Sequence, residues 1–500
     1  MAITAGGSLN SVPAPKQQVL ATNYLDLSGS GGWGQQYVPD LMEKEAEVFG
    51  PRTISGFLAQ VGAEEAMQAD QVIWSEQGRL HLSYTGKVAA NGGITQNSVA
   101  SSVITIQKDI DGQSLHADGH AIRVNDTVIV ADSVNGIVKC LVTKITATTA
   151  HVLPYDAGAS QLSAQTVDNA TTVLVYGSEF GKGSKYRNGL NTADSESRGA
   201  IEPRFTTFTN KPIIMKDYYE VSGSDASRVG WIEVASEEGQ SGYLWYLKAE
   251  ADTRARFNDY IEMALIEAEK NDSSSVLDGA TDLLAGSEAG KDVGTEGLFA
   301  AIESRGNLSS GITGVNAATD LAEFDAILAE FDKQGAIEEN MLFLNRNTSL
   351  AIDDMLASMN SYGAGGTSYG VFDNDEDMAL NLGFSGFRRG SYDFYKSDFR
   401  YLNDFATRGS INLANSANAI RGVVIPAGVS TVYDQSLGSN IKRPFLHVRY
   451  RASQTDDRRM KTWVTGSVGA ATSALDAMQL HMLTERCLIV QGANNFMLLN

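Results

Sequence analysis

Apolar residues recur at helical spacing from Tyr243 to Glu269, the longest uninterrupted periodic stretch of the chain. They fall at steps of three, four or small multiples, and so share one side of an α-helix: Leu244, Leu247, Ala251, Phe257, Ile261, Ala264, Leu265 and Ala268. A helix of this length spans about 40 Å, roughly twice an ordinary globular helix. Because a compact domain cannot cover its whole circumference, we expect one side to face solvent or another subunit.

Charged residues on this stretch stand four apart with the acid first, the orientation that stabilises an exposed helix face. Glu250 precedes Arg254 in this way, and Asp252 precedes Arg256. Aromatic residues in two glycine-rich segments, Gly29–Gly34 and Asn360–Gly370, join them as candidates for contact between subunits. The predicted subunit-contact residues are Arg254, Arg256, Glu250, Asp252, Tyr362 and Trp33.

Before the helix, the pattern changes to the alternation typical of strands. Gln71–Tyr84 and Phe205–Val221 alternate in this way, and the region between them contains several short alternating segments from Ala121 to Val175. One of these turns at Asn135-Gly136, a strong hairpin signal. We therefore predict an inserted small β-barrel or sandwich at about 111–177. The polar stretch from Lys87 to Gly119 is not expected to form a core by itself.

After the helix, helical and strand patterns are mixed. The helices predicted here are Gly297–Ser304, Asp320–Lys333 with Thr319 as its cap, and Ser349–Met359. The predicted strands are Met341–Leu344, short segments around Phe387, Tyr392–Phe394 and Val423–Ile425, then Phe445–Tyr450, Met460–Val468 and Cys487–Val490.

Up to about residue 30 the chain is polar and shows neither the helical period nor the alternation of a strand. This pattern predicts an arm that becomes ordered only on binding a partner. Pro39–Phe49 is expected to form a short amphipathic helix. Gly29–Gly34 matches the spacing of a dinucleotide fingerprint, but the segment before it is short and half polar, so a flexible hinge is the favoured interpretation.

Composition narrows the class of protein. The 500 residues are 43% hydrophobic and carry a net charge of −21, so the chain repels DNA phosphate and anionic lipid over most of its surface. The start has no basic or apolar region of a signal peptide, and no run of about eighteen apolar residues occurs. We therefore expect neither a secretory signal nor a membrane span.

No arrangement of residues predicts catalysis. The six histidines are scattered, and Cys140 and Cys487 stand in alternating and apolar strands, where burial is expected. The acidic run Asp373–Asp377 begins like a calcium loop, but Met378 and Phe384 occupy the positions that require glycine and glutamate. We predict no catalytic residue, no cofactor and no metal, and hence no enzyme activity.

The order of these parts resembles that of the major capsid proteins of tailed bacteriophages, the Hong Kong 97 fold, and within them favours crAss-like phages. That order is a polar arm, a short helix, a two-stranded excursion with a β insertion, a long exposed helix, a mixed domain and a returning strand. The resemblance covers essentially the whole chain and is architectural. It implies an α+β fold with an N-arm, an extended loop, a spine helix, and peripheral and axial domains, plus the inserted β-barrel or sandwich.

Under this resemblance, Tyr243–Glu269 is the spine helix, and the alternating segments Gln71–Tyr84 and Phe205–Val221 are the sides of the extended loop. The implied divisions are arm and short helix 1–70, extended loop 71–110, inserted β domain 111–177, returning loop 178–237, peripheral domain 238–295, axial domain 296–430, and peripheral return with C-terminus 431–500.

The resemblance implies a structural subunit that assembles with copies of itself into pentamers and hexamers of an icosahedral capsid. The capsid would enclose double-stranded DNA in the virion and be assembled in the bacterial cytoplasm, with portal, scaffold and decoration proteins as candidate partners. Two alternatives stay open. A tail or baseplate component should be mainly β with repeats or coiled-coil heptads, and a soluble enzyme should bind a small molecule at Gly29–Gly34.

Overall fold

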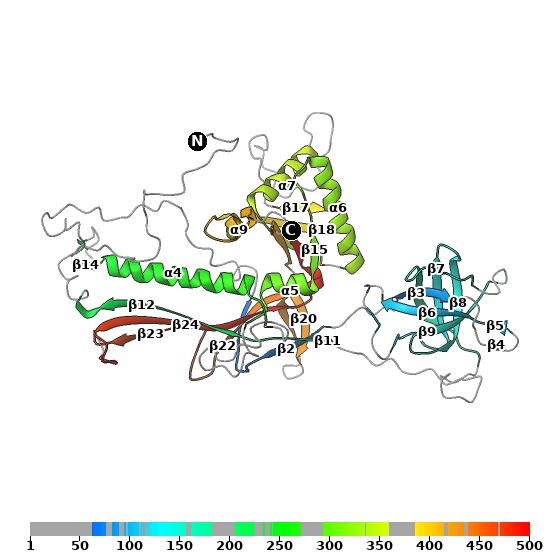
Figure 1. Cartoon of the computed structure of the whole chain (residues 1–500), viewed down its shortest axis with the longest axis horizontal. Helices are drawn as coiled ribbons and strands as arrows, with labels where there is room; N and C mark the ends of the chain where they lie inside the picture. The colour runs from blue at the N-terminus through cyan, green and yellow to red at the C-terminus, as the bar shows by residue number, and fades with distance from the viewer. Residues whose placement is uncertain are drawn as a thin grey trace. The chain divides into compact units, whose positions relative to one another are not determined.

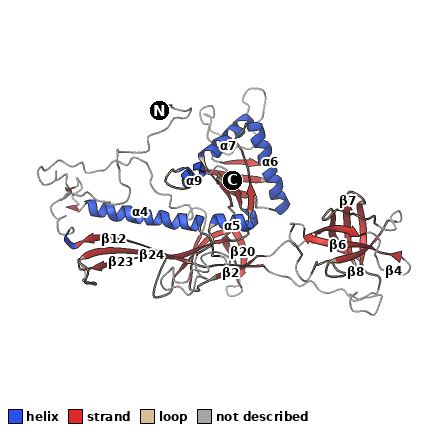
Figure 2. Cartoon of the chain, in the orientation of Figure 1, coloured by secondary structure: helices blue, strands red, loops and turns tan. Residues whose placement is uncertain are grey.

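The computed structural model describes residues 63–76, 83–89, 95–96, 99–109, 112, 114–115, 119–156, 162–182, 206–224, 234–235, 241–242, 244–271, 294–335, 337–359, 386–414, 419–427, 429–434, 439–468 and 471–500. Helices and strands are mixed, and strands predominate (Figure 2). The chain divides into two units, one made of residues 1–74 and 208–500 and the other of Ser75–Thr207 (Figure 1).

The longest strand of the first unit is β24 (Ala477–Val490), which organises a five-stranded sheet. Along one side it pairs antiparallel with β12 (Ile213–Ser222), and along the other with β23 (Lys461–Gly466) and β22 (Leu446–Arg451). Strand β1 (Ala63–Met67) completes the sheet parallel to β22. Segments far apart in sequence are thus held by one strand.

Helix α4 (Leu244–Glu267) confirms the predicted long helix and runs along this sheet (Figure 1). From residue 250 on, where its side chains are described, its buried residues are Thr253, Phe257, Ile261, Glu262, Leu265 and Ile266. The apolar ones form one hydrophobic core with α5 (Leu298–Arg305) and the sheet. Ala251, which we expected on the apolar side, is exposed, because the buried stripe passes through Thr253 instead.

A second core of the same unit lies in a six-stranded sheet. Its order is β15 (Asn307–Ser309), β25 (Met497–Leu499), β19 (Gly422–Pro426), β16 (Glu339–Leu344), β18 (Tyr392–Asp398) and β17 (Gly386–Arg389). Helices α6 (Ala317–Gln334) and α7 (Arg346–Met359) pack on it through residues such as Phe324, whose ring centroid lies 5.1 Å from that of Phe394. The C-terminal strand β25 therefore belongs to this sheet, whereas the sequence division grouped it with 431–500.

The cap of α6 differs from its prediction. Asn316, not Thr319, is the N-cap residue, and its side chain accepts a hydrogen bond of 3.0 Å from the Thr319 backbone N–H. An N-cap side chain bonds the N–H three residues further on, so the helix begins at Ala317, earlier than its apolar period indicates.

The Ser75–Thr207 unit is a closed six-stranded barrel. Its strands, in order around the barrel, are β10 (Thr171–Ser178), β3 (Ser83–Ala89), β6 (Ser102–Asp109), β9 (Thr149–Pro154), β8 (Gly136–Ile145) and β7 (Asp126–Asp132). The predicted hairpin at Asn135-Gly136 is present, with Gly136 at a φ of 66°. Two of the barrel strands, β3 and β6, precede residue 111, where the sequence placed the start of the insertion.

Strand β3 extends beyond Tyr84, where the predicted alternating segment ends, because Gly86 and Lys87 interrupt the apolar pattern. Gly86 is required by packing: a Cβ atom there would lie 2.1 Å from the Thr105 carbonyl oxygen on β6. The close approach of β3 to β6 coincides with a register shift between Thr85 and Gly86.

The remaining elements are short or form two-stranded sheets. The pairs are β2 (Val72–Glu76) with β11 (Thr206–Asn210), β4 (Thr95–Gln96) with β5 (Val99–Ala100), β13 (Val234–Ala235) with β14 (Ser241–Gly242), and β20 (Val429–Asp434) with β21 (Ser439–Pro444). Short helices are α8 (Arg400–Asn403), α9 (Arg408–Ala414) and the 3-10 helix η5 (Ala493–Asn495).

The structure yields a prediction about the barrel. Replacing residues 77–205 by a short Gly-Ser linker should leave a soluble, folded protein, because the barrel and the first unit have separate hydrophobic cores. Soluble yield and a thermal melt followed by circular dichroism measure this.

Deleting only residues 115–175 is the matched comparison. It removes β7, β8, β9 and most of β10 and leaves β3 and β6 with unpaired edges, so this variant should aggregate. Insolubility of the larger deletion would contradict the independence of the two cores.

Candidate subunit-contact site

The charged pairs predicted on α4 are partly confirmed in geometry. Arg254 lies 2.7 Å from the Glu250 carboxylate, and nearly half of its side chain is exposed. Arg256 reaches the sheet, where its Nη2 lies 3.6 Å from Oδ2 of Asp217 on β12. Arg254 and Glu250 therefore form the outward pair, whereas Arg256 ties the helix to its own sheet.

The other predicted contact residues are placed differently. Asp252 is half-buried on α4. Trp33 and Tyr362 lie outside the described residues, as do Gly29–Gly34, Pro39–Phe49 and Asp373–Asp377. The role of all six residues in subunit contact stays a prediction.

A dense ionic cluster, which the sequence did not predict, joins β1, β22, β24 and the turn before β23. Glu485 is almost fully buried, and its two oxygens lie 2.7 Å from the guanidinium groups of Arg451 and Arg458. The other pairs of this cluster are Glu64 with Arg459 and Arg486, Glu65 with Arg449, and Asp70 with Arg451. We call this set the arginine cluster.

The electrostatics of the cluster follow from its partners. The hydrogen bond to Asp70 raises the pKa of Arg451 above the usual arginine value, and Glu485 acts in the same direction. Burial lowers the pKa of Arg486, and Glu64 opposes that effect. Both side chains stay cationic at neutral pH, since arginine has a pKa above 12 in water. The cluster is therefore a set of five arginines and four carboxylates whose ion pairs fix β1 against β22 and β24.

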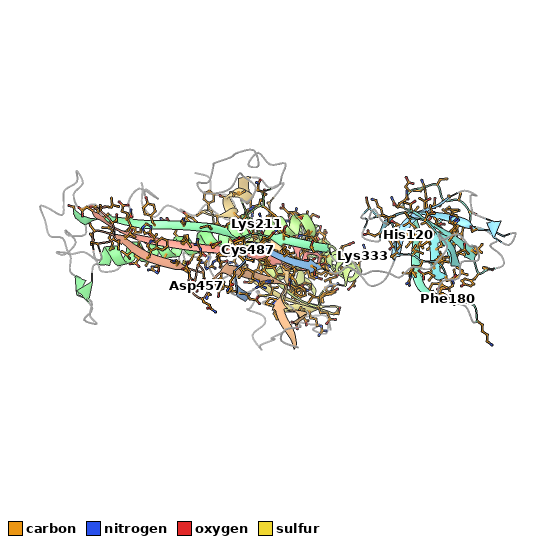
Figure 3. The ribbon with its side chains drawn as sticks, turned by 90° about the horizontal axis from the view of Figure 1, so that it is seen from below. His120, Phe180, Lys211, Lys333, Asp457 and Cys487 are labelled. Carbon is orange, nitrogen blue, oxygen red and sulfur yellow. The ribbon has the colours of Figure 1, made fainter. Side chains whose placement is uncertain are left out.

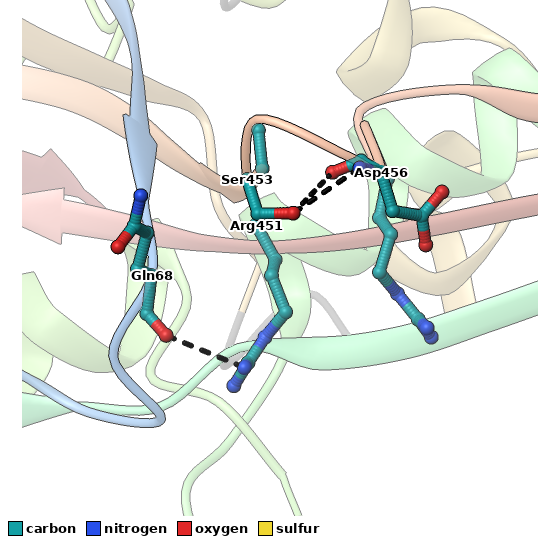
Figure 4. Close-up of a pocket in the computed structure, with 6 residues that line it drawn as sticks. Gln68, Arg451, Ser453 and Asp456 are labelled. Carbon is teal, nitrogen blue, oxygen red and sulfur yellow. Dashed lines mark hydrogen bonds between the residues drawn. The ribbon is translucent and has the colours of Figure 1, made fainter.

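A cavity of about 300 Å³ opens beside the cluster (Figure 4). Its lining residues are Gln68, Arg451, Ala452, Ser453, Asp456 and Arg458. The Ser453 hydroxyl accepts from the Asp456 backbone N–H at 3.1 Å, and Arg451 donates to the Gln68 carbonyl at 3.4 Å. Because the carboxylates of Glu485 and Asp70 balance the charges of Arg451 and Arg458, the cavity offers little binding energy to an anion.

Asn210, at the end of β11, is a second organising residue that the sequence did not reveal. Its fully buried amide donates to the carbonyls of Leu488 and Glu296, at 2.6 and 3.0 Å. Its oxygen accepts from the Thr295 hydroxyl and the Glu296 backbone N–H. With a bond that the oxygen accepts from the Lys211 backbone N–H, the five bonds of the amide stay within the first unit and join β11, β24 and the segment before α5.

No metal-ligand cluster of His, Cys, Asp or Glu occurs among the described residues. Burial raises the pKa of both Cys140 and Cys487 to about 12, so neither thiol is a nucleophile at neutral pH. Cys487 lies inside the β24 sheet, and His120 lies in the barrel unit (Figure 3). In the described parts of the chain, no helix is both long and apolar enough to cross a membrane.

Local spacing could have revealed part of the arginine cluster. Arg449 and Arg451 are two apart in an alternating strand, which places them on one face. Their partners Glu65 and Glu485 come from β1 and β24, which only the sheet register brings together, and Asp70 comes from the bend after β1. No sequence signal identified those partners.

No protein-family description and no curated protein matches the chain. Among solved structures, it is similar to one from Microbacterium phage Oxtober96, at 8% identity over 95% of this chain and 99% of that chain, with a TM-score of 0.37. It is similar to a structure from Gordonia phage Cozz at 10% identity over 97% of each chain, with a TM-score of 0.36. It is similar to the capsid structure of the cyanophage P-SCSP1u at 8% identity over 62% of this chain and 79% of that chain, with a TM-score of 0.31. Values this low establish neither a shared fold nor a shared function.

The arginine cluster gives a testable prediction. Glu485→Gln should destabilise the first unit by about 3 kcal/mol, because two partly buried guanidinium groups lose their charged partner. Chemical denaturation measures the change.

Glu250→Gln is the matched control, because it makes the same chemical change in an exposed helical pair and should cost only about 0.5 kcal/mol. Equal effects of the two substitutions would show that the cluster does not hold the sheet together.

Proposed function

We propose that the chain is a structural subunit of a tailed-phage capsid with Hong Kong 97-type organisation. Copies would assemble into pentamers and hexamers of an icosahedral shell that encloses double-stranded DNA. In this proposal α4 is the spine helix, and its five-stranded sheet is the peripheral domain. The six-stranded sheet with α6 and α7 is the axial domain. Strands β2 and β11 are the root of an extended loop that carries the barrel.

The observation that carries the proposal is the one-sided burial of α4. The helix has 24 residues, and from residue 250 on, where its side chains are described, the buried apolar ones lie on the side that faces one sheet: Phe257, Ile261, Leu265 and Ile266. Tyr260, at 43% exposed, and the Arg254–Glu250 pair lie off that side. A long helix that its own chain covers on one side suits a subunit whose neighbours cover the other.

A second feature supports an assembly. Strands β2 and β11 form a two-stranded sheet whose inner face packs on the five-stranded sheet through Trp74 and Phe208. On the other face, Ile73 of β2 is 62% exposed, so apolar surface is available to a neighbour. This exposed face favours a chain that is completed by other copies.

The charge of the chain fits a container for DNA. A net charge of −21 disfavours tight adhesion to phosphate, which would hinder the packaging and release of DNA. Location in the virion, assembly in the bacterial cytoplasm, and contacts with portal, scaffold and decoration proteins belong to the same proposal. So do the placement of Tyr362 near a symmetry axis and the relation to crAss-like phages.

The proposal is tested by reversing the outward charge on α4. Arg254→Glu should leave the thermal melt almost unchanged, because exposed substitutions alter stability by about 0.5 kcal/mol or less. The same change recurs in every copy, and a loss of about 1.4 kcal/mol per contact weakens that contact tenfold. Sedimentation velocity should therefore show a large loss of assembled particles.

Arg254→Lys keeps the charge and should assemble nearly as well as the original chain. Arg256→Glu serves as a comparison, because its loss of Asp217 should lower the melting temperature as well. Normal assembly of Arg254→Glu with only a lowered melting temperature would contradict the proposed contact.

A further inference from the structure

The barrel has an unusually apolar outer surface on four of its strands. Strands alternate, so residues between the core positions point outward. On β10, β7, β8 and β9 the outward positions include large apolar and aromatic residues: Leu174, Tyr176, Ile129, Ile137, Leu141, Leu153 and, just after β9, Tyr155. Ile137 is 78% exposed, and Tyr155 and Tyr176 are each about half exposed.

These residues form one continuous surface, because the strand register aligns them. Leu174 lies opposite Ile129, and Ile129 lies opposite Lys139. The Tyr155 backbone N–H donates to the Lys139 carbonyl, which places Tyr155 next in the same row. Leu141 and Leu153 are paired in the adjacent row. We call this surface the apolar barrel face.

The opposite side of the barrel is polar. Outward residues of β3 and β6 include Thr85, Lys87, Thr105 and Gln107. Lys87 and Gln107 both donate to the carboxylate of Asp168, at 2.7 and 2.8 Å. The barrel fold therefore does not require apolar residues on its outer surface, since β3 and β6 carry polar residues there. An exposed apolar surface confined to one side marks an interaction site.

Charge favours a second copy of the barrel as the occupant. The Ser75–Thr207 unit contains 11 Lys and Arg against 12 Asp and Glu, which gives −1, so the rest of the chain carries −20 of the total −21. Two barrels can thus approach without the repulsion that opposes contact between the other parts of two chains.

The charges on the face itself are self-complementary. Lys139 lies in the middle of the apolar row, and within the described part of the chain no carboxylate pairs with it. Asp156 and Glu179 lie exposed at the rim, where Glu179 accepts a hydrogen bond from the Tyr155 hydroxyl. In a two-fold arrangement, residue i of one copy contacts residue j of the other, and j contacts i. An axis that lies between Lys139 and the rim therefore pairs each Lys139 with the acidic rim of the other copy.

We propose that the apolar barrel face binds the same face of a second copy of this chain. Four strands about 4.8 Å apart, with three or four outward residues each, offer on the order of 300 Å². A stable complex buries about 800 Å² per partner, so this contact is weak between free chains. The contact between barrels becomes strong where other contacts hold the copies close together, because their local concentration is then high. This strengthening rests on the proposed shell.

The test uses the full-length chain and a short bis-maleimide cross-linker. Both native cysteines are fully buried, so a single introduced cysteine gives the signal. Ile137→Cys should yield a cross-linked dimer on a denaturing gel, both in assembled particles and in concentrated solution. Thr105→Cys, which points outward from the polar side, is the matched control and should yield little.

A second variant separates specific contact from random collision. Adding Leu174→Asp to the Ile137→Cys chain should lower the dimer yield about tenfold, since a buried charge in the contact costs more than 1.4 kcal/mol. Adding Thr105→Asp makes the same charge change on the polar side and should leave the yield unchanged.

The outcomes distinguish this inference from the proposed function. Shells that form without the dimer at position 137 would overturn the inference and leave the capsid proposal intact. A specific dimer from a chain that never forms shells would support the inference and count against the capsid proposal. Absence of the dimer in both particles and concentrated solution would also overturn the inference, and would assign the face to a different protein.

Discussion

Burial of β24 on both of its faces is the constraint on which the first unit depends. On one face, Met482 and Leu488 pack in the core beneath α4, and on the other, Cys487 and Ile489 pack against Met67 and Trp74. The strand also hydrogen-bonds to β12, β22 and β23 along its 14 residues. Because a strand that is buried on both faces cannot shift without exposing apolar residues, it fixes the positions of every segment paired with it.

The arginine cluster adds specificity to this hydrophobic constraint. Strand β1 is a short edge strand, and its successive residues Glu64 and Glu65 pair with arginines on different strands. A slip of one residue would move both acids to the wrong face and leave buried charges without partners. The chain therefore enters the sheet in one register, and from the same sheet it continues through β2 toward the barrel.

Much of the fold follows from local patterns, and the exceptions have physical causes. The period of the α4 stretch and the Asn135-Gly136 turn are local signals, and the structure confirms both. Only the last residues of β24 were predicted, because Thr484 and Glu485 interrupt its apolar pattern and are buried through partners distant in sequence. The same reasoning applies to the site. The Glu250–Arg254 pair is set by helical spacing, whereas the partners of Glu485 depend on tertiary structure.

We propose that this chain is completed by copies of itself. Electron microscopy with light scattering on the purified full-length chain, alone and co-expressed with its genomic neighbours, tests this self-assembly. Rings of five or six subunits or closed shells are the expected result. A folded monomer that stays monomeric under every condition would contradict it, and would return attention to the small-molecule hypothesis at Gly29–Gly34.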